Sequence, residues 1–199
     1  TAIQQQNITV IAWMPGLAYT PFLAADDSNM VQGLQGKTGW YRRLSPFDEQ
    51  GLQKVQTLYG DLGRYTTAQG VLLQDDLYLN DFEDASPVGQ QAYQKAFGQT
   101  FTAQKGQQGE KWVDLKTERL NEAADKALKA FRQTRPNAIT MRDVYSAPVL
   151  NPKSREWFAQ DYRDCLKRYD YTVVMAYPQM DHQADAQLYL QDVAQAAKK

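Results

Sequence analysis

Short runs of apolar residues alternate with longer stretches of mixed polarity along the chain, and this pattern predicts alternating strands and helices. The apolar runs are rich in β-branched residues and lack polar alternation, which is typical of strands buried on both faces of a sheet. They predict strands over residues 8–14, 70–74, 138–145 and 171–178. The stretches after them predict helices over about 45–59, 88–97, 112–135, 156–169 and 184–197.

Capping residues set the expected helix boundaries. The dipeptide Ser45-Pro46 predicts a helix start, because serine caps free N–H groups and proline fits the first helical turn. Ser86-Pro87 repeats this signature before the next helix. Gly60 and Gly63 predict the end of the first helix.

The predicted order of elements fits an α/β fold with a parallel sheet, because strands separated by helices form right-handed βαβ crossovers. Two architectures remain open, a doubly wound sheet and part of a TIM-type barrel. No GxGxxG or P-loop motif follows a predicted strand, which removes the commonest reason for a doubly wound sheet. A full barrel needs about 250 residues and eight strands. We therefore expect an incomplete (β/α) TIM-type barrel, one domain over residues 1–199, whose missing strands are cut off or absent.

Composition and charge exclude several classes of function. The 22 basic and 23 acidic side chains give a formal net charge of −1 without a long basic run, so no nucleic-acid partner is expected. The single cysteine excludes an internal disulfide, and the single histidine excludes any site that needs two imidazoles. We accordingly expect no metal and no cofactor. No apolar run approaches the roughly 18 residues that span a bilayer.

Candidate chemistry is sought at the carboxyl ends of the strands, where both architectures place their active sites. Acidic and aromatic residues gather at these ends: Trp13, Asp75, Asp76, Tyr145, Tyr177 and Asp181. The loop after the second strand adds Asp81, Glu83 and Asp84. Glycosidases flank a scissile bond with two carboxyl groups, and aromatic rings give sugars an apolar platform. The pattern therefore points to carbohydrate chemistry.

Each of these features also has a structural interpretation. Paired acids after a strand often cap the next helix, and the acids at 81–84 precede a helix whose dipole they would stabilise. Tryptophans are more often core residues than sugar platforms, although Trp40 is a better functional candidate because it lies in a polar, glycine-containing loop. Asp143 can pair with Arg142 or another base. These alternatives stay open on the residue pattern alone.

Five separated segments of the chain together resemble a known protein family. They are WYRRLSPFD (40–48), QGVLLQDDLYLNDFEDASP (69–87), EKWVDLKTERLNE (110–122), VLNPKSREWFAQ (149–160) and YDYTVVMAYPQMD (169–181). In this order they resemble the C-terminal domain of the PgaB/HmsF family, the poly-β-1,6-N-acetyl-D-glucosamine N-deacetylases of bacterial biofilms. The resemblance runs from about Ile8 to Asp181, which is most of the chain.

The resemblance implies an incomplete barrel that binds partly deacetylated poly-N-acetylglucosamine and hydrolyses it as an endo-glycosidase. It also implies a longer periplasmic protein, associated with the outer membrane as a lipoprotein. In such a protein a metal-dependent N-deacetylase domain is linked to this one and works with an outer-membrane exporter. The single histidine cannot supply the two histidines of that domain's metal set, so deacetylation is not assigned to this chain.

Carried over residue by residue, the resemblance places the catalytic carboxylate on Asp75, with the adjacent Asp76 as the alternative. Asp181 stands where relatives tend to carry the longer glutamate, and it is a candidate for the second catalytic carboxylate. Substrate-binding roles are expected for acids and aromatic rings that the resemblance or the strand ends place nearby: Trp40, Tyr41, Asp81, Glu83, Tyr145, Trp157 and Tyr177.

The resulting hypothesis is that Asp75 donates a proton to the glycosidic oxygen of a β-1,6 linkage. A neighbouring carboxylate, or the substrate's own N-acetyl oxygen, then stabilises the oxocarbenium-like centre. The alternative is a non-catalytic module that holds the polymer for a linked deacetylase. A doubly wound domain with another function is the third possibility.

Overall fold

The computed structural model describes residues 6, 8–19, 29–39, 41–102 and 109–198. Its centre is a four-stranded parallel sheet in chain order, made of β1 (Ile11–Met14), β2 (Gly70–Leu73), β3 (Ile139–Tyr145) and β4 (Tyr171–Met175). A doubly wound sheet reverses its strand order at a switch point, and this sheet does not. The sheet is open, so the prediction of an incomplete (β/α) barrel is confirmed.

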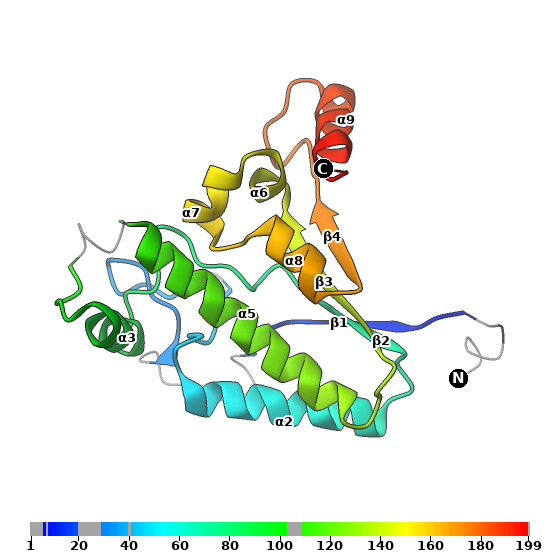
Figure 1. Cartoon of the computed structure of the whole chain (residues 1–199), viewed down its shortest axis with the longest axis horizontal. Coiled ribbons are helices and arrows are strands. Elements are labelled where there is room, and N and C mark those ends of the chain that lie inside the picture. The colour runs from blue at the N-terminus through cyan, green and yellow to red at the C-terminus, as the bar shows by residue number, and fades with distance from the viewer. Residues whose placement is uncertain (1–5, 7, 20–28, 40, 103–108, 199) are drawn as a thin grey trace.

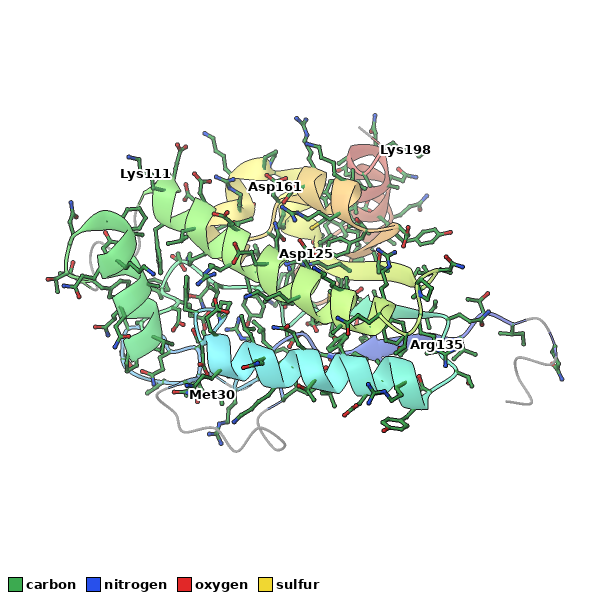
Figure 2. The ribbon with its side chains drawn as sticks, turned by 60° about the horizontal axis from the view of Figure 1, so that its bottom comes forward. Met30, Lys111, Asp125, Arg135, Asp161 and Lys198 are labelled. Atoms are coloured by element: carbon green, nitrogen blue, oxygen red, sulfur yellow. The ribbon has the colours of Figure 1, made fainter. Side chains whose placement is uncertain are left out.

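The helices pack mainly along one side of the strands. Figure 1 shows α2 and α5 side by side, with α3 near the start of α5 and α6, α7 and α9 towards the carboxyl ends of β3 and β4, while α8 leads into the start of β4. In the turned view of Figure 2, α2 and α5 still run together, with Lys111 and Asp125 on α5. The bounds are α2 (Glu49–Tyr65), α3 (Pro87–Phe97), α5 (Glu110–Arg132), α6 (Ser146–Leu150), η3 (Pro152–Ser154), α7 (Arg155–Phe158), α8 (Tyr162–Arg168) and α9 (Ala186–Ala196).

The two faces of the sheet have different surroundings. Leu73 and Arg142 are paired in register, and both are fully buried on the face that α5 covers. The Arg142 guanidinium donates to Asn121 Oδ1 of α5 at 2.6 Å. Because successive strand residues point to opposite faces, Asp143 lies on the other face, where Trp13 is 63% exposed. The neighbours Arg142 and Asp143 therefore do not pair.

An aromatic cluster fixes the start of α5 against α3. Trp112 is 1% exposed, and its ring stacks on Phe47 with the centroids 5.4 Å apart. Tyr93 of α3 meets the same indole edge-on at 5.2 Å, and Phe97 and Phe101 complete the cluster. This cluster lies in the hydrophobic core, so Trp112 is a core residue.

The first predicted helix has different ends in the structure. Asp48, and not Ser45, is the N-cap of α2, and its carboxylate accepts from the Gln50 N–H. The helix also continues past Gly60 and Gly63 to Tyr65. A Cβ at Gly63 would lie 2.8 Å from the Phe131 carbonyl of α5, so this glycine permits close helix packing instead of ending the helix. The prediction for Ser86 is confirmed, since its hydroxyl accepts from the Gly89 N–H at the start of α3.

The single helix predicted over residues 156–169 is wrong. The chain forms the short helices η3, α7 and α8 there, after α6, which directly follows β3. Ala159 ends α7 with a left-handed φ of 47°, and Asp161 caps α8 by accepting from the Asp164 N–H at 3.0 Å. A strong local cap therefore divides a segment that has a continuous amphipathic pattern.

Candidate active site

Two phenols hold the carboxylate of Asp75, which follows β2 at its carboxyl end. Tyr41 donates its hydroxyl to Oδ2 of Asp75 at 3.2 Å, and Tyr145 at the end of β3 donates to the same oxygen at 3.3 Å. Burial and the charge of Asp75 raise the pKa of Tyr41 to about 12, and the same causes raise the pKa of Tyr145. Both phenols therefore stay protonated as donors. The structure brings these three predicted site residues together.

A second carboxylate lies near Asp75 on the open face of the sheet. Asp143 of β3 is 5% exposed, and its Oδ2 accepts from the indole Nε1 of Trp13 at 3.1 Å. Burial raises the pKa of Asp143 to about 6, and the charge of Asp75 adds to the shift. The sequence interpretation did not assign Asp143 to the site. The alternation of faces along β3 was the available signal, because it excludes pairing with Arg142.

The Trp13 indole gives a direct readout of this carboxylate. We expect the Nε1–H resonance of Trp13 to titrate with a midpoint at about pH 6, because Asp143 loses its proton there. The unfolding free energy should fall as the pH rises from the ordinary pKa of 3.8 through about 6, since the folded state binds this proton more tightly than the unfolded chain. NMR of indole-labelled protein measures the midpoint, and Asp143→Asn should remove the step. A Trp13 resonance that does not move between about pH 4 and pH 8 would contradict the assignment.

Asp76 faces away from Asp75 and is fully buried. Its carboxylate accepts from the backbone N–H groups of Gly16, Leu17 and Ala18 at 2.8, 2.6 and 2.6 Å. It therefore ties the loop after β1 to the end of β2. A sugar cannot contact this carboxylate, so Asp76 has a structural position and is not the alternative catalytic group that the sequence suggested.

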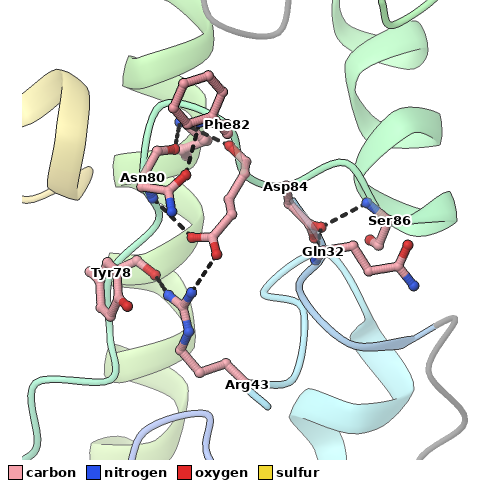
Figure 3. A network of polar contacts seen from close by, with 9 residues as sticks. Gln32, Arg43, Tyr78, Asn80, Phe82, Asp84 and Ser86 are labelled. Atoms are coloured by element: carbon pink, nitrogen blue, oxygen red, sulfur yellow. Dashed lines mark hydrogen bonds and ion pairs between the residues drawn. The ribbon is translucent and has the colours of Figure 1, made fainter. Parts of the chain in front are cut away.

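The acid loop, residues 78–84, follows directly and is braced by a buried ion pair. Arg43 Nη2 lies 2.7 Å from Glu83 Oε1, and the same guanidinium donates to the Tyr78 carbonyl, as Figure 3 shows. The Arg43 guanidinium also lies over the Tyr78 ring, 3.9 Å from its centroid. The Tyr78 ring meets Tyr145 edge-on at 5.5 Å. These contacts connect the acid loop to the residues that hold Asp75.

The three acids of the loop differ in their contacts: two have hydrogen-bonded carboxylates, and the third does not. Asp84 is fully buried and accepts from the Ser45 hydroxyl at 2.6 Å. It also accepts from the backbone N–H of Ser86 at 2.9 Å, as Figure 3 shows. The Glu83 carboxylate is paired with Arg43, so it also has a structural position. Asp81 is partly exposed, and within the described part of the chain its carboxylate accepts no hydrogen bond and makes no ion pair.

The other predicted site residues lie around later elements. Asp181 accepts from the Ser146 hydroxyl at 3.1 Å and from the Tyr189 hydroxyl, which places it beside α6 and α9. No direct contact joins it to Asp75 among the residues that the structure describes. Trp157 on α7 is 51% exposed and Tyr177 is 50% exposed, so both rings are open to a ligand. Trp40 lies outside the described residues.

Over the ranges that the structure describes, no group of three or more histidine, cysteine, aspartate or glutamate side chains is arranged to hold a metal ion. In the same ranges no helix has the length and apolar content that crossing a membrane requires.

An open, parallel (β/α) array with carboxylates and phenols at its carboxyl edge has the arrangement of a glycoside-hydrolase-type domain. The chain belongs to hypothetical glycosyl hydrolase family 13, whose family model matches residues 3–199. The resemblance to PgaB-type proteins is confirmed by the curated relatives and by a solved structure.

The similarity to these relatives extends over most of this chain but over only part of theirs. The chain is 33% identical over 196 residues to the poly-beta-1,6-N-acetyl-D-glucosamine N-deacetylases of Escherichia coli K12 and O157:H7, and it matches with 91% of its own length. It spans only 28% of the length of those relatives. The solved structure of the PgaB (BpsB) glycoside hydrolase domain from Bordetella bronchiseptica has a TM-score of 0.85 at 26% identity. That match covers 98% of this chain and 59% of the solved chain.

Proposed function

We propose that this domain binds partly deacetylated poly-β-1,6-N-acetyl-D-glucosamine and hydrolyses it as an endo-acting glycosidase. The observation that carries the proposal is the Asp75 carboxylate held by Tyr41 and Tyr145 at the carboxyl edge of the sheet. The open carboxylate of Asp81 follows on the braced loop. The choice of polymer is inferred from the names of the relatives, and the choice of glycoside hydrolysis is inferred from the pair of acids.

The contacts favour different tasks for the two acids. An ionised carboxylate only accepts hydrogen bonds, which suits the two phenol donors on Asp75. We therefore assign to Asp75 the stabilisation of positive charge at the anomeric carbon. Asp81 then donates a proton to the glycosidic oxygen as the C–O bond breaks, and the resulting Asp81 carboxylate takes the proton of the water that adds to the anomeric carbon. This exchanges the proton donor of the sequence hypothesis, Asp75, for Asp81.

The wider setting of the domain is part of the same proposal. The curated relatives are longer than this chain and are named as deacetylases, which supports a linked N-deacetylase domain in the parent protein. The periplasmic, outer-membrane-associated location and the partnership with an exporter rest on the family resemblance alone.

Product analysis tests the proposed reaction. The chain is incubated with partly deacetylated and with fully acetylated polymer, and the products are sized by mass spectrometry. Shorter oligosaccharides from the partly deacetylated polymer alone are the expected result. Unchanged polymer in both samples would contradict hydrolysis.

A binding module is the second candidate function, and the exposed rings of Trp13, Trp157 and Tyr177 favour it. Its signature would be retention of intact polymer on immobilised protein, with no new oligosaccharides. Trp157→Ala and Tyr177→Ala would then weaken retention. Neither retention nor cleavage would contradict both functions.

A further inference from the structure

A buried lysine supports the acid loop from α5. Lys116 is fully buried, and its ammonium donates to the backbone carbonyls of Asn80 at 2.6 Å and Glu83 at 2.9 Å. No carboxylate of the described residues lies within ion-pair distance of its Nζ. Burial lowers the pKa of Lys116 to about 8, against the opposing charges of Glu83, Asp81 and Asp84.

Burying an ammonium group without a paired carboxylate is costly, so its hydrogen bonds have to be well formed. Here both acceptors belong to the same short turn, and they stand on either side of Asp81 and Phe82. The lysine ammonium therefore links the first and the last residue of the turn through their backbone carbonyls.

The turn is further fixed by its own hydrogen bonds. The Asn80 N–H donates to Glu83 Oε2 at 3.0 Å, and the Glu83 N–H donates to the Asn80 carbonyl at 3.2 Å. The Phe82 N–H donates to Asn80 Oδ1 at 2.8 Å. These contacts hold the backbone on both sides of Asp81, while the Asp81 carboxylate itself makes no hydrogen bond or ion pair within the described residues.

We propose that Lys116 is a positioning residue that fixes the Asn80–Glu83 turn and thereby sets the place of the Asp81 carboxylate at the cleavage site. The inference rests on the proposed function for the role of Asp81. Whether Lys116 fixes the turn can be measured by amide hydrogen exchange, which does not depend on enzymatic activity. Rate losses of about 10- to 100-fold are typical when a reacting group is displaced by a fraction of an ångström to one ångström.

Two substitutions test the inference. Lys116→Met removes both charge and donors, and Lys116→Gln keeps two N–H donors and serves if the methionine variant does not fold. We expect kcat for polymer cleavage to fall about 10- to 100-fold, while KM stays within about two-fold, because binding uses other residues. We also expect the Phe82 and Glu83 amides to exchange with solvent at least about 10-fold faster, with the β2 amides unchanged. Lys116→Arg should recover part of the kcat by restoring the charge.

Lys126→Gln is the matched control, because Lys126 lies on the same helix but pairs at the surface with Glu49 at 2.7 Å. It should change neither kcat nor the exchange of the turn. Unchanged exchange of the Phe82 and Glu83 amides in the Lys116 variants would overturn the inference, as would faster exchange with unchanged kcat. If the unmodified chain cleaves no polymer, the proposed function fails, and the exchange measurement still decides whether Lys116 fixes the turn.

Discussion

Replacing Asp81 by asparagine is expected to slow cleavage of partly deacetylated polymer by about 10²- to 10⁴-fold, the range that a positioned general acid contributes. Asparagine has nearly the same shape but no transferable proton. Because the Asp81 side chain makes no hydrogen bond or ion pair within the described residues, the substitution removes chemistry without removing a fold contact. The initial rate of oligosaccharide release, measured with the unfolding free energy of the same variant, checks the prediction.

Asp192→Asn is the control, because Asp192 is an exposed carboxylate on α9 and, within the described residues, makes no hydrogen bond or ion pair with the residues around Asp75. It should keep the full rate. Asp75→Asn should also reduce the rate, because it removes the negative charge that the proposed mechanism uses to stabilise the anomeric carbon. An Asp81→Asn variant that cleaves within about three-fold of the unmodified chain would remove Asp81 from the mechanism and return the donor role to Asp75.

Trp112→Ala is expected to destabilise the fold by about 3–5 kcal/mol, the usual cost of truncating a large buried aromatic side chain. The indole is 1% exposed and packs on Phe47 at 5.4 Å and Tyr93 at 5.2 Å, so its loss opens a cavity between α3 and α5. Urea unfolding followed by circular dichroism measures the change in the unfolding free energy.

Trp157→Ala supplies the comparison within the same residue type. Trp157 is 51% exposed, so its truncation should change the unfolding free energy by no more than about 0.5 kcal/mol. Equal stability losses in the two variants would contradict the division into a core tryptophan and a surface tryptophan.

The alternation of apolar runs and amphipathic stretches was enough to predict the parallel (β/α) order. Each run of β-branched residues between helices has few alternatives to a buried strand, and all four strands appear near their predicted positions. Helix ends were less predictable, because capping signals compete locally. Ser45 has the sequence of an N-cap, yet its hydroxyl donates to Asp84 of a distant loop, and Asp48 caps the helix instead.

The candidate site divides in the same way. The sequence by itself determined that acids and aromatic rings follow the strand ends, because parallel strands in a βαβ order bring their carboxyl ends to one edge. Only the tertiary structure decided which of two adjacent aspartates faces that edge. Asp75 accepts from the phenols of Tyr41 and Tyr145, while Asp76 is buried against the loop after β1 and accepts from its backbone N–H groups. The physical reason is that hydrogen-bond partners so far apart along the chain are selected by packing, which no local pattern encodes. The same reason separates Glu83, held by Arg43, from Asp81, whose carboxylate makes no hydrogen bond or ion pair within the described residues.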